Sequence, residues 1–318
     1  MTYSKDTDRA NEFAPIIIFV YNRLSHTKQT IEALQKNQYA AQSDLFIYSD
    51  APKNVDTEAQ VQEVRNYISS VAGFRTIKIV ERDINLGLAA NIIDGVTEVV
   101  NQYGKIIVME DDIVTSPAYL SFMNQALDLY EHDTKAWHIS GWNYPIERDG
   151  LGDTFFWRVM NCWGWATWAD RWQYFDKNPR RLIETWNKQK RFHFDLDGSG
   201  IFWQQVTANA SKEIDTWAIF WYASIYENSG LCLNPSHSFV KNIGNDGSGI
   251  HCDDSRIHNK SNATLCNKQE LIFPENVIEC SLAVKNIKDY NRKSKPLFII
   301  RLINKLSRVF FKTNIMKV

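Results

Sequence analysis

The sequence predicts an α/β fold, a doubly wound, mostly parallel sheet with helices on both faces. In the first 140 residues, short apolar runs rich in β-branched residues alternate with segments of helical periodicity, and the connections are short. Polar and acidic residues follow these runs directly, at the strand ends where such folds bind ligands. All eleven tryptophans lie between Trp137 and Trp221, so the second half differs from the first in composition.

Five strands are expected in the first part of the chain. Each is an apolar run of the length found in buried parallel strands, and turn residues bound it on at least one side. The expected strands are 16–21, 45–49, 76–80, 105–109 and 136–140.

Helix signals fill the segments between these strands. Ser25 is a suitable N-cap for the first helix, and Thr57 with Gln60 forms a capping box at the start of the second. Gly104 follows the third helix, as glycine often does at a helix C-terminus, and Pro117 lies in the first turn of the fourth. The expected helices are 25–37, 57–71, 88–103 and a helix that opens at 116–117.

Composition and charge exclude several classes of protein. The chain has no apolar run long enough for a membrane-spanning helix, and its polar start lacks the apolar core of a secretory signal. Residues 1–284 carry 26 basic and 36 acidic residues, a net of −10, which argues against nucleic-acid binding. The cysteines form no CxxC pair, so we expect reduced thiols and a cytoplasmic protein; they are Cys162, Cys232, Cys252, Cys266 and Cys280.

Three adjacent carboxylates, Glu110, Asp111 and Asp112, follow the apolar strand 105–109. Adjacent carboxylates repel one another unless a cation or hydrogen-bond donors compensate. Oxygen ligands suit Mg²⁺ or Mn²⁺, which complete their coordination with water and phosphate oxygens. The triplet therefore predicts a metal–diphosphate site; the alternative is a solvated acidic turn that caps the helix near Ser116. No GxGxxG or GxxxxGK[ST] motif is present, which argues against dinucleotide and P-loop binding.

An ordered series of short motifs continues along the chain from these strand ends. The motifs are 20–23, 48–50, 108–113 with Pro117, 136–143, 163–165 with Trp172, 215–217 and 247–251. In this order they resemble glycosyltransferases of the GT-A fold, most closely the N-acetylglucosaminyltransferase I family, over roughly residues 13–255. Each motif is weak alone, and the order makes the resemblance specific.

The resemblance implies a set of nucleotide contacts at the ends of the first strands. Arg23 would pair with the diphosphate, beside Tyr21 and Asn22 in the same motif. Asp50 would accept a hydrogen bond from uracil or ribose. Asn91 stands where the family has a histidine and would take its place near the nucleotide.

The resemblance also implies the metal site and a closing loop. Asp112 would bind Mn²⁺ or Mg²⁺ directly, and Glu110 and Asp111 would hold the sugar and the surroundings of the metal. His251 follows the glycine-rich segment 244–249, which could close over the phosphates. The alternative for His251 is an ordinary loop histidine.

Asp215 matches the position of the family's catalytic base. Transfer with inversion needs a carboxylate that takes the proton from the acceptor hydroxyl, while the sugar passes through an oxocarbenium-like transition state. Because Trp217 and other aromatic residues follow closely, we expect burial to raise the pKa of Asp215. The alternative is that Asp215 caps a helix that begins at Thr216, and Glu213 is then the candidate base.

The tryptophans predict both core and ligand contacts. Trp165, Trp168 and Trp172 are spaced i, i+3 and i+7, as on one face of a helix. Most such rings are expected in the core, because they are large and apolar. The rings next to proposed site residues are expected to stack on the acceptor sugar; they are Trp142, Trp163 and Trp217.

The C-terminal segment has a separate composition. Residues 285–318 carry ten Lys or Arg and one acidic residue, Asp289, and 296–318 contains an amphipathic helical pattern. Such a segment suits a helix on an anionic membrane surface, and docking on the domain or on a dimer partner is the alternative. We therefore expect a domain over 13–255, with a donor half to 140 and an acceptor half after it, and an extension over 256–318.

The expected function is that of a metal-dependent, inverting glycosyltransferase. It would move a sugar, N-acetylglucosamine or a related one, from a UDP-sugar to a saccharide or lipid-linked saccharide in bacterial surface polysaccharide or glycolipid assembly. We expect a cytoplasmic enzyme that associates with the inner face of the membrane and binds no nucleic acid. The alternatives are a sugar nucleotidyltransferase, which would normally show a glycine-rich basic loop after the first strand, and a non-catalytic sugar-binding protein.

Overall fold

A computed structural model describes residues 13–244 and 264–294, and the structural statements below concern these residues. Within them, no helix is long and apolar enough to cross a bilayer. The elements in chain order are β1 (Ile16–Val20), α1 (Leu24–Gln35), the 3₁₀ turn η2 (Ala40–Gln42), β2 (Asp44–Ser49), α2 (Val55–Ile68), β3 (Thr76–Glu81), α3 (Gly87–Tyr103), β4 (Lys105–Glu110), β5 (Ile113–Thr115), α4 (Tyr119–Leu129), β6 (Ala136–Ser140), β7 (Thr154–Trp157), β8 (Trp165–Trp168), α5 (Ala169–Trp172), α6 (Pro179–Thr185), α7 (Lys188–Phe194), α8 (Trp203–Ala210), α9 (Ala218–Glu227), β9 (Leu231–Pro235), β10 (Val240–Asn242) and α10 (Ser281–Ser294).

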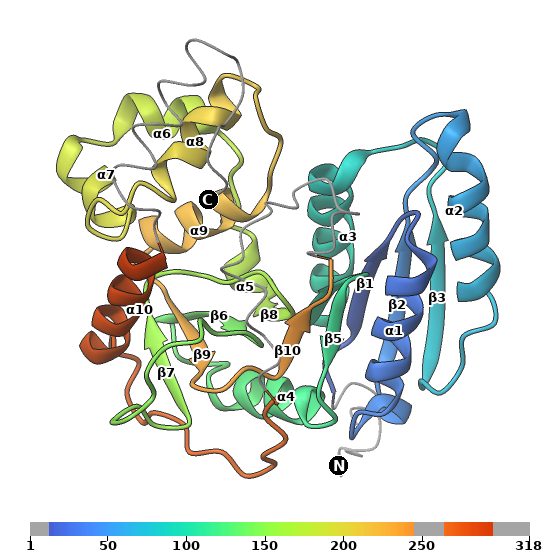
Figure 1. Cartoon of the computed structure of the whole chain (residues 1–318), viewed down its shortest axis with the longest axis horizontal. Helices are drawn as coiled ribbons and strands as arrows, with labels where there is room; N and C mark the ends of the chain where they lie inside the picture. Colours follow the sequence, from blue (N-terminus) through green and yellow to red (C-terminus); the bar gives the residue numbers. More distant parts are fainter. Residues whose placement is uncertain (1–12, 245–263, 295–318) are drawn as a thin grey trace, which may run out of the picture.

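An eight-stranded sheet runs through the molecule in the order β3-β2-β1-β4-β8-β6-β9-β7 (Figure 1). The neighbours from β3 to β4 are parallel, as are β6 and β9. Strand β8 is antiparallel to both β4 and β6, and β7 is antiparallel to β9. A second, two-stranded sheet pairs β10 with β5. The α/β fold with a mostly parallel central sheet is confirmed.

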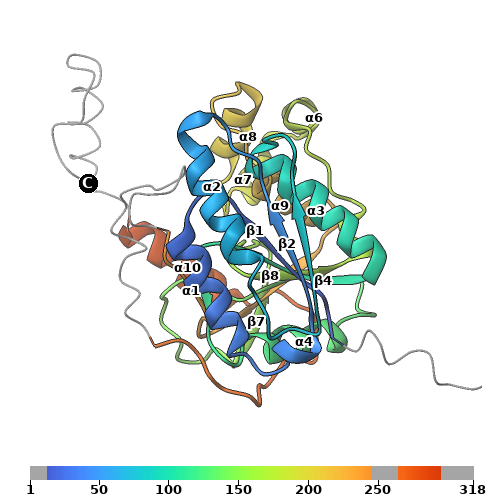
Figure 2. The same ribbon diagram turned by 90° about the vertical axis from the view of Figure 1, so that its right-hand side faces the viewer.

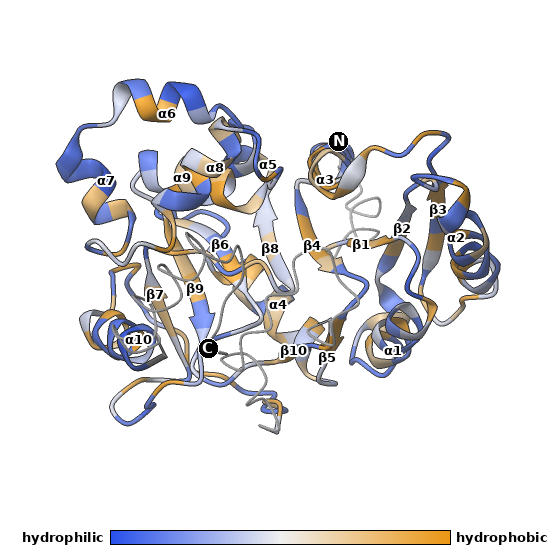
Figure 3. Cartoon of the chain, turned by 45° about the horizontal axis from the view of Figure 1, so that its top comes forward, coloured by the Kyte–Doolittle hydropathy of each residue, from blue (hydrophilic) through white to orange (hydrophobic). Residues whose placement is uncertain are grey.

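The parallel strands divide their side chains between two cores. Ile17 and Val108 belong to one cluster with residues of α3, whereas Ile18, Ile47 and Ile107 belong to another with residues of α1 and α2. Figure 2 shows α3 on the opposite side of these strands from α1 and α2. Figure 3 shows apolar residues concentrated along β1 and β4, while α1 and α2 are largely hydrophilic. Burial on both faces explains why these strands are continuous apolar runs in sequence.

The expected elements of the first 140 residues are present, but three helix starts differ. α4 begins at Tyr119 with Ala118 as its N-cap, so Pro117 lies before this helix and not in its first turn. α3 ends at Gly104, which has a φ of 80°, as expected. α1 begins at Leu24 with Arg23 as its N-cap, so the expected Ser25 cap is wrong. The capping box of α2 joins Asn54 and Thr57, whose hydroxyl accepts from the Asn54 amide at 3.4 Å. Thr57 is therefore the third residue of the helix, at the end of the box, and not its cap.

The prediction that Trp165, Trp168 and Trp172 share one face of a helix is wrong. Trp165–Trp168 forms the strand β8, and only Trp172 lies in the single turn of α5. Trp165 belongs to the core cluster on the α3 side and Trp168 to the opposite one. The two rings lie on opposite sides of the sheet because they are three positions apart in a strand, where side chains alternate.

The described part of the predicted extension packs on the same cores. Val277 and Ile287 belong to the two core clusters, and the Phe273 ring stacks on Phe122 with centroids 6.2 Å apart. The Cys280 amide donates to the Phe156 carbonyl of β7 at 2.8 Å, and α10 lies near β7 in Figure 1. Residues 264–294 are therefore part of one body with the preceding domain, and the domain limits stay a prediction.

His138 of β6 is fully buried and held from both sides. Trp221 Nε1 donates to His138 Nδ1 at 3.2 Å, so the Nε2–H group donates to the Asn161 carbonyl at 3.0 Å. Burial lowers the pKa of His138 to about 3. An unfolded histidine has a pKa near 6.5, so between these pH values the unfolded state binds more protons, and stability is lost as the pH falls below about 6.5.

We therefore expect His138 to make the free energy of unfolding fall by about 1.4 kcal/mol per pH unit below pH 6.5. His138→Gln retains a donor and an acceptor but does not titrate. Urea unfolding of both proteins at pH 7 and pH 5 measures the effect. A loss of stability that is the same in the wild type and in His138→Gln contradicts the prediction.

Candidate functional site

The carboxylates of the acidic triplet lie where β4 turns into β5. Glu110 is the last residue of β4, and Asp111 and Asp112 form the turn. The Thr30 hydroxyl of α1 donates to the Asp111 carbonyl at 2.8 Å. On the other side, the Ile243 amide, just after β10, donates to the Asp112 carbonyl at 2.9 Å. The turn is thus fixed by α1 on one side and by the end of β10 on the other.

Arg23 places its guanidinium against two of these carboxylates. Its Nη2 lies 2.8 Å from Asp112 Oδ2, and its Nε donates to Asp111 Oδ2 at 3.3 Å, with a further Nη2 bond to Asp111. The Arg23 side chain is 19% exposed. The structure thus brings together four of the predicted site residues. The proposed partner of Arg23, a diphosphate, would have to compete with these carboxylates.

One arginine does not neutralise three adjacent carboxylates, of which Asp111 is buried and Glu110 and Asp112 are half-buried. Burial, with the charges of Asp112 and Asp111, raises the pKa of Glu110 to about 8. Burial also raises the pKa of Asp111 to about 6, against the opposing effect of Arg23. Both shifts come mainly from burial, which disfavours the charged form, and a bound cation would oppose them.

The residues of the turn fit a divalent cation that shares its coordination with other ligands. Mg²⁺ is typically held by one or two carboxylates, with water and substrate phosphate oxygens in the remaining positions. Across residues 13–244 and 264–294, no three His, Cys, Asp or Glu side chains are grouped as a metal cage. Asp112, with Glu110 or Asp111 beside it, could therefore hold such an ion together with ligands from outside the described residues.

Gly244 lets the backbone pass directly over the Arg23–Asp112 ion pair. A Cβ atom at this position would lie 2.1 Å from Asp112 Oδ2 and 2.9 Å from Arg23 Nη1. The Gly244 amide donates to Asn242 Oδ1 at 2.7 Å, which ties this residue to β10. The sequence placed Gly244 in a flexible closing loop but gave no signal of its contact with the triplet.

Asp50 is buried and binds the chain itself. Its carboxylate accepts from the Leu86 and Gly87 amides, each at 2.9 Å, and from Asn85 Nδ2 at 3.2 Å. It thereby holds the loop that leads into α3, where a negative charge is favourable at a helix N-terminus. A direct contact of Asp50 with a nucleotide stays a prediction, and these internal donors compete with it.

Tyr21 and Asn22 connect the end of β1 to the start of α2. The Tyr21 hydroxyl accepts from the Lys53 amide at 3.0 Å, and Asn22 Nδ2 donates to Gln60 Oε1 at 3.0 Å. Both side chains are half-buried. Their predicted contact with a nucleotide is not tested by these bonds, which fix the loop that carries Arg23.

Asn91 lies buried on α3 and holds a second arginine. Its Oδ1 accepts from Arg82 Nε at 3.0 Å, and the Arg82 guanidinium lies over the Tyr48 ring, 5.0 Å from its centroid. This bond engages the Asn91 side chain within the chain, and a contact of Asn91 with a nucleotide stays a prediction. Sequence reasoning missed Arg82, since it stands in no recognised motif.

The expected environment of Asp215 is wrong. Its side chain is 77% exposed and forms an ion pair with Lys177, so it is not desolvated among aromatic residues. The helix cap expected at this position is also wrong, because α9 begins at Ala218 with Trp217 as its N-cap. Residues 214–217 form an irregular connection before α9, in which the Asp215 side chain is exposed and the Trp217 ring is buried.

The three tryptophans expected at the acceptor fall into two groups. Trp142 and Trp163 are half-buried, and their rings meet edge to face with centroids 4.6 Å apart. Trp217 is 3% exposed and stacks on Trp165 at 5.1 Å. The structure contradicts an acceptor contact for Trp217, because its ring is enclosed in the core.

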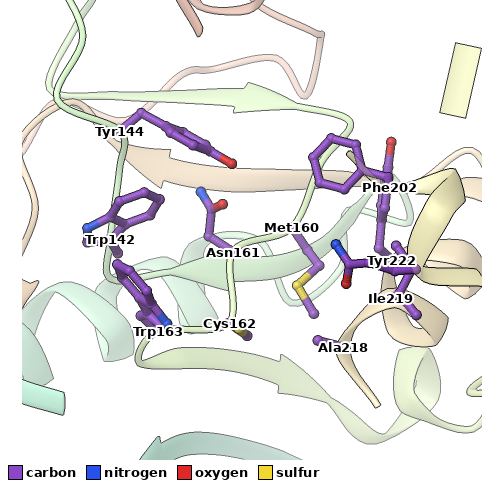
Figure 4. Close-up of a pocket in the computed structure, with 11 residues that line it drawn as sticks. Trp142, Tyr144, Met160, Asn161, Cys162, Trp163, Phe202, Ala218, Ile219 and Tyr222 are labelled. Atoms are coloured by element: carbon purple, nitrogen blue, oxygen red, sulfur yellow. The ribbon is translucent and has the colours of Figure 1, made fainter. Parts of the chain in front are cut away.

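A cavity of about 200 Å³ opens beside Trp142 and Trp163 (Figure 4). Its lining is aromatic and aliphatic, with Asn161 and Gln205 as its amides. Apolar rings with a few polar groups are characteristic of small-molecule sites. The other lining residues are Tyr144, Met160, Cys162, Phe202, Ala218, Ile219 and Tyr222.

Cys162 connects this cavity to the acidic triplet. Burial, together with the negative charges of Glu110 and Asp112, raises the pKa of its thiol to about 12. Because charge interactions weaken with distance, Cys162 and the cavity it lines lie within electrostatic reach of these carboxylates. The predicted metal site and the two half-buried tryptophans thus border one region of the molecule.

His251 and the segment 296–318 lie outside the described residues.

The family model described as "Glycosyl transferase family 2" matches residues 16–184, more than half of the chain. The chain belongs to glycosyl transferase family 2. The match spans β1 to β8, the triplet and both half-buried tryptophans, and it ends before Asp215. Together with the sheet, this family confirms the predicted GT-A fold class and the predicted enzyme class, a glycosyltransferase that uses a nucleotide sugar.

Two solved structures of glycosyltransferases are similar to this family member. The mannosyltransferase PcManGT from Pyrobaculum calidifontis, in complex with GDP-Man and Mn²⁺, has 10% identity and a TM-score of 0.38, over 68% of this chain and 69% of its own. S. aureus TarS has 10% identity and a TM-score of 0.37, over 71% of this chain and 36% of its own. No curated protein matches the sequence.

Gly244→Ala is expected to displace the Asp112 carboxylate, because the new methyl group would overlap it. Small displacements of catalytic groups can cost on the order of a hundredfold in rate, and we expect a loss of this size in sugar transfer. The protein should still fold, since Asp112 and Arg23 meet the methyl group through the ends of their side chains.

Gly152→Ala is the matched control, because a Cβ there would make only ordinary contact, 3.5 Å from the Thr154 carbonyl. Release of nucleoside diphosphate and the melting temperature are measured for both variants. If Gly244→Ala is as active as Gly152→Ala, the close approach of Gly244 has no functional role.

Proposed function

We propose that this glycosyltransferase transfers a sugar with inversion from a UDP-sugar to a saccharide acceptor and depends on Mn²⁺ or Mg²⁺. The observation that carries the proposal is the acidic triplet around the buried Asp111, whose charge Arg23 only partly balances. An under-compensated anionic turn at the carboxyl end of a parallel strand suits a cation that arrives with a diphosphate. The family match favours transfer of the sugar itself over the transfer of a nucleotide.

The donor would bind at the ends of β1 and β4. Asp112 would hold the metal, with Glu110 and Asp111 supporting it and the sugar. When bound, the metal supplies positive charge that stabilises the departing diphosphate. Arg23 would exchange its carboxylate partners for the diphosphate, to which a guanidinium can donate two parallel hydrogen bonds. Asn91 and Asp50 would support this site from α3 and from the loop before it.

The acceptor would approach from the cavity beside Trp142 and Trp163. The apolar C–H face of a sugar can pack on an indole while its hydroxyl groups remain hydrated. Asp215 is the proposed base that takes the proton of the attacking hydroxyl. It precedes Ala218 and Ile219, which line the cavity, by only a few residues. To act, Asp215 would have to leave Lys177.

The finer identity of the substrates rests on the resemblance in sequence to the N-acetylglucosaminyltransferase I family. That resemblance supports UDP-N-acetylglucosamine or a related donor. It also supports an acceptor in bacterial surface polysaccharide or glycolipid assembly. The basic amphipathic pattern of 296–318 supports contact with an anionic membrane, where a lipid-linked acceptor would be found.

Asp112→Asn is expected to abolish metal-dependent donor binding, because the amide lacks the charge that holds the cation. Calorimetry with UDP should show binding by the wild type in the presence of Mn²⁺ and at least tenfold weaker binding by the variant, an effect of about 1.4 kcal/mol. Asp128→Asn, on α4 and exposed, is the matched control. Equal affinities with and without Mn²⁺, or unchanged binding by Asp112→Asn, would remove the metal assignment.

Asp215→Asn is expected to bind the donor normally and to transfer sugar more slowly. Loss of a general base typically costs between a hundredfold and ten-thousandfold in rate. The comparison with Glu213→Gln tests the neighbouring carboxylate in the same assay. Full activity of Asp215→Asn together with slow transfer by Glu213→Gln would move the base to Glu213.

A further inference from the structure

Asn161 presents a hydrogen-bond donor that no other described residue uses. Its side chain is 8% exposed, and its Nδ2 has no hydrogen-bond partner among the described residues. Buried amides are almost always paired, so an unpaired one that lines a cavity indicates a missing ligand atom. Figure 4 shows the Asn161 side chain extending from the segment between Met160 and Cys162 toward Tyr144.

A hydrogen bond to the Asn161 backbone fixes the position of this donor. His138 Nε2 donates to the Asn161 carbonyl at 3.0 Å, and Trp221 orients the His138 ring through Nδ1. Both partners are fully buried. The Asn161 backbone is therefore anchored to β6 and α9, and its amide is presented to the cavity in a set position.

The surroundings of the amide are mainly apolar. Met160, Ala218 and Ile219 line the cavity with carbon and sulfur, and Trp163 adds an aromatic face. The volume of about 200 Å³ corresponds to about seven water molecules, at roughly 30 Å³ each, which is room for one sugar ring. A fitting ligand would offer an acceptor atom to Asn161 and a small apolar group to its neighbours.

We propose that Asn161 determines specificity by donating to the acetamido carbonyl of an N-acetylated sugar in this cavity. The acetamido group combines the two required features, since its oxygen accepts a hydrogen bond and its methyl group is apolar. A hydroxyl at the same place would bring its own donor into apolar surroundings, where leaving it unpaired is unfavourable. The inference rests on the proposed function for the presence of a sugar and adds the chemistry that selects it.

The test compares N-acetylated and unsubstituted sugars by calorimetry in two arms. One arm uses the methyl glycosides of N-acetylglucosamine and glucose without metal or nucleotide, and the other uses UDP-N-acetylglucosamine and UDP-glucose with Mn²⁺. The proteins are the wild type, Asn161→Leu, which keeps the size but loses the donor, and Asn66→Leu, an exposed control on α2. Melting temperatures confirm that each variant is folded.

The wild type and Asn66→Leu should prefer the N-acetylated sugar by at least about tenfold in one arm, and Asn161→Leu should lose that preference. Preference among free glycosides identifies the acceptor as the source of the acetamido group, and preference only among nucleotide sugars identifies the donor. The absence of preference in both arms, or its survival in Asn161→Leu, overturns the proposal. If only the proposed function is wrong, UDP binding will not depend on the metal, and the preference among the free glycosides will be unchanged.

Discussion

The ion pair between Arg23 and the buried carboxylates of Asp111 and Asp112 is the interaction on which the site depends. It lets a parallel strand end in three acidic residues inside the protein, where unpaired carboxylates would be strongly unfavourable. The compensation is incomplete, as the raised pKa of Glu110 shows. The ion pair with Arg23 thus reduces the cost of placing these carboxylates in the folded protein, and the remaining negative charge can be balanced by an additional cation.

The rest of the fold supports this turn from several directions. The Thr30 hydroxyl and the Ile243 amide fix its carbonyl groups, and Gly244 passes close enough to cover the ion pair. Strand β8 inserts its tryptophans between β4 and β6 and thereby joins the parallel strands to the aromatic region. The loop before β8 carries Cys162, which borders both the carboxylates and the cavity. The sheet thus places a charged site and an apolar site side by side.

The sequence predicted the parallel part of the fold well because its strands are buried on both faces and bear a strong, unmixed signal. It also predicted the triplet and Arg23, which stand at strand ends. It failed at Trp165 and Trp168, since a spacing of three fits both a helix face and a four-residue strand, and only pairing with β4 and β6 decides between them. Asp215, Trp217 and Asn161 depend on how irregular segments turn, and no local pattern encodes whether such side chains are enclosed or exposed.

The most direct test is a crystal structure with Mn²⁺ and UDP, with the metal located by its anomalous scattering. The account predicts the ion at the carboxylate of Asp112, with Arg23 released from Asp112 and bound to the diphosphate. A metal and nucleotide bound elsewhere, with the Arg23–Asp112 pair intact, would contradict it.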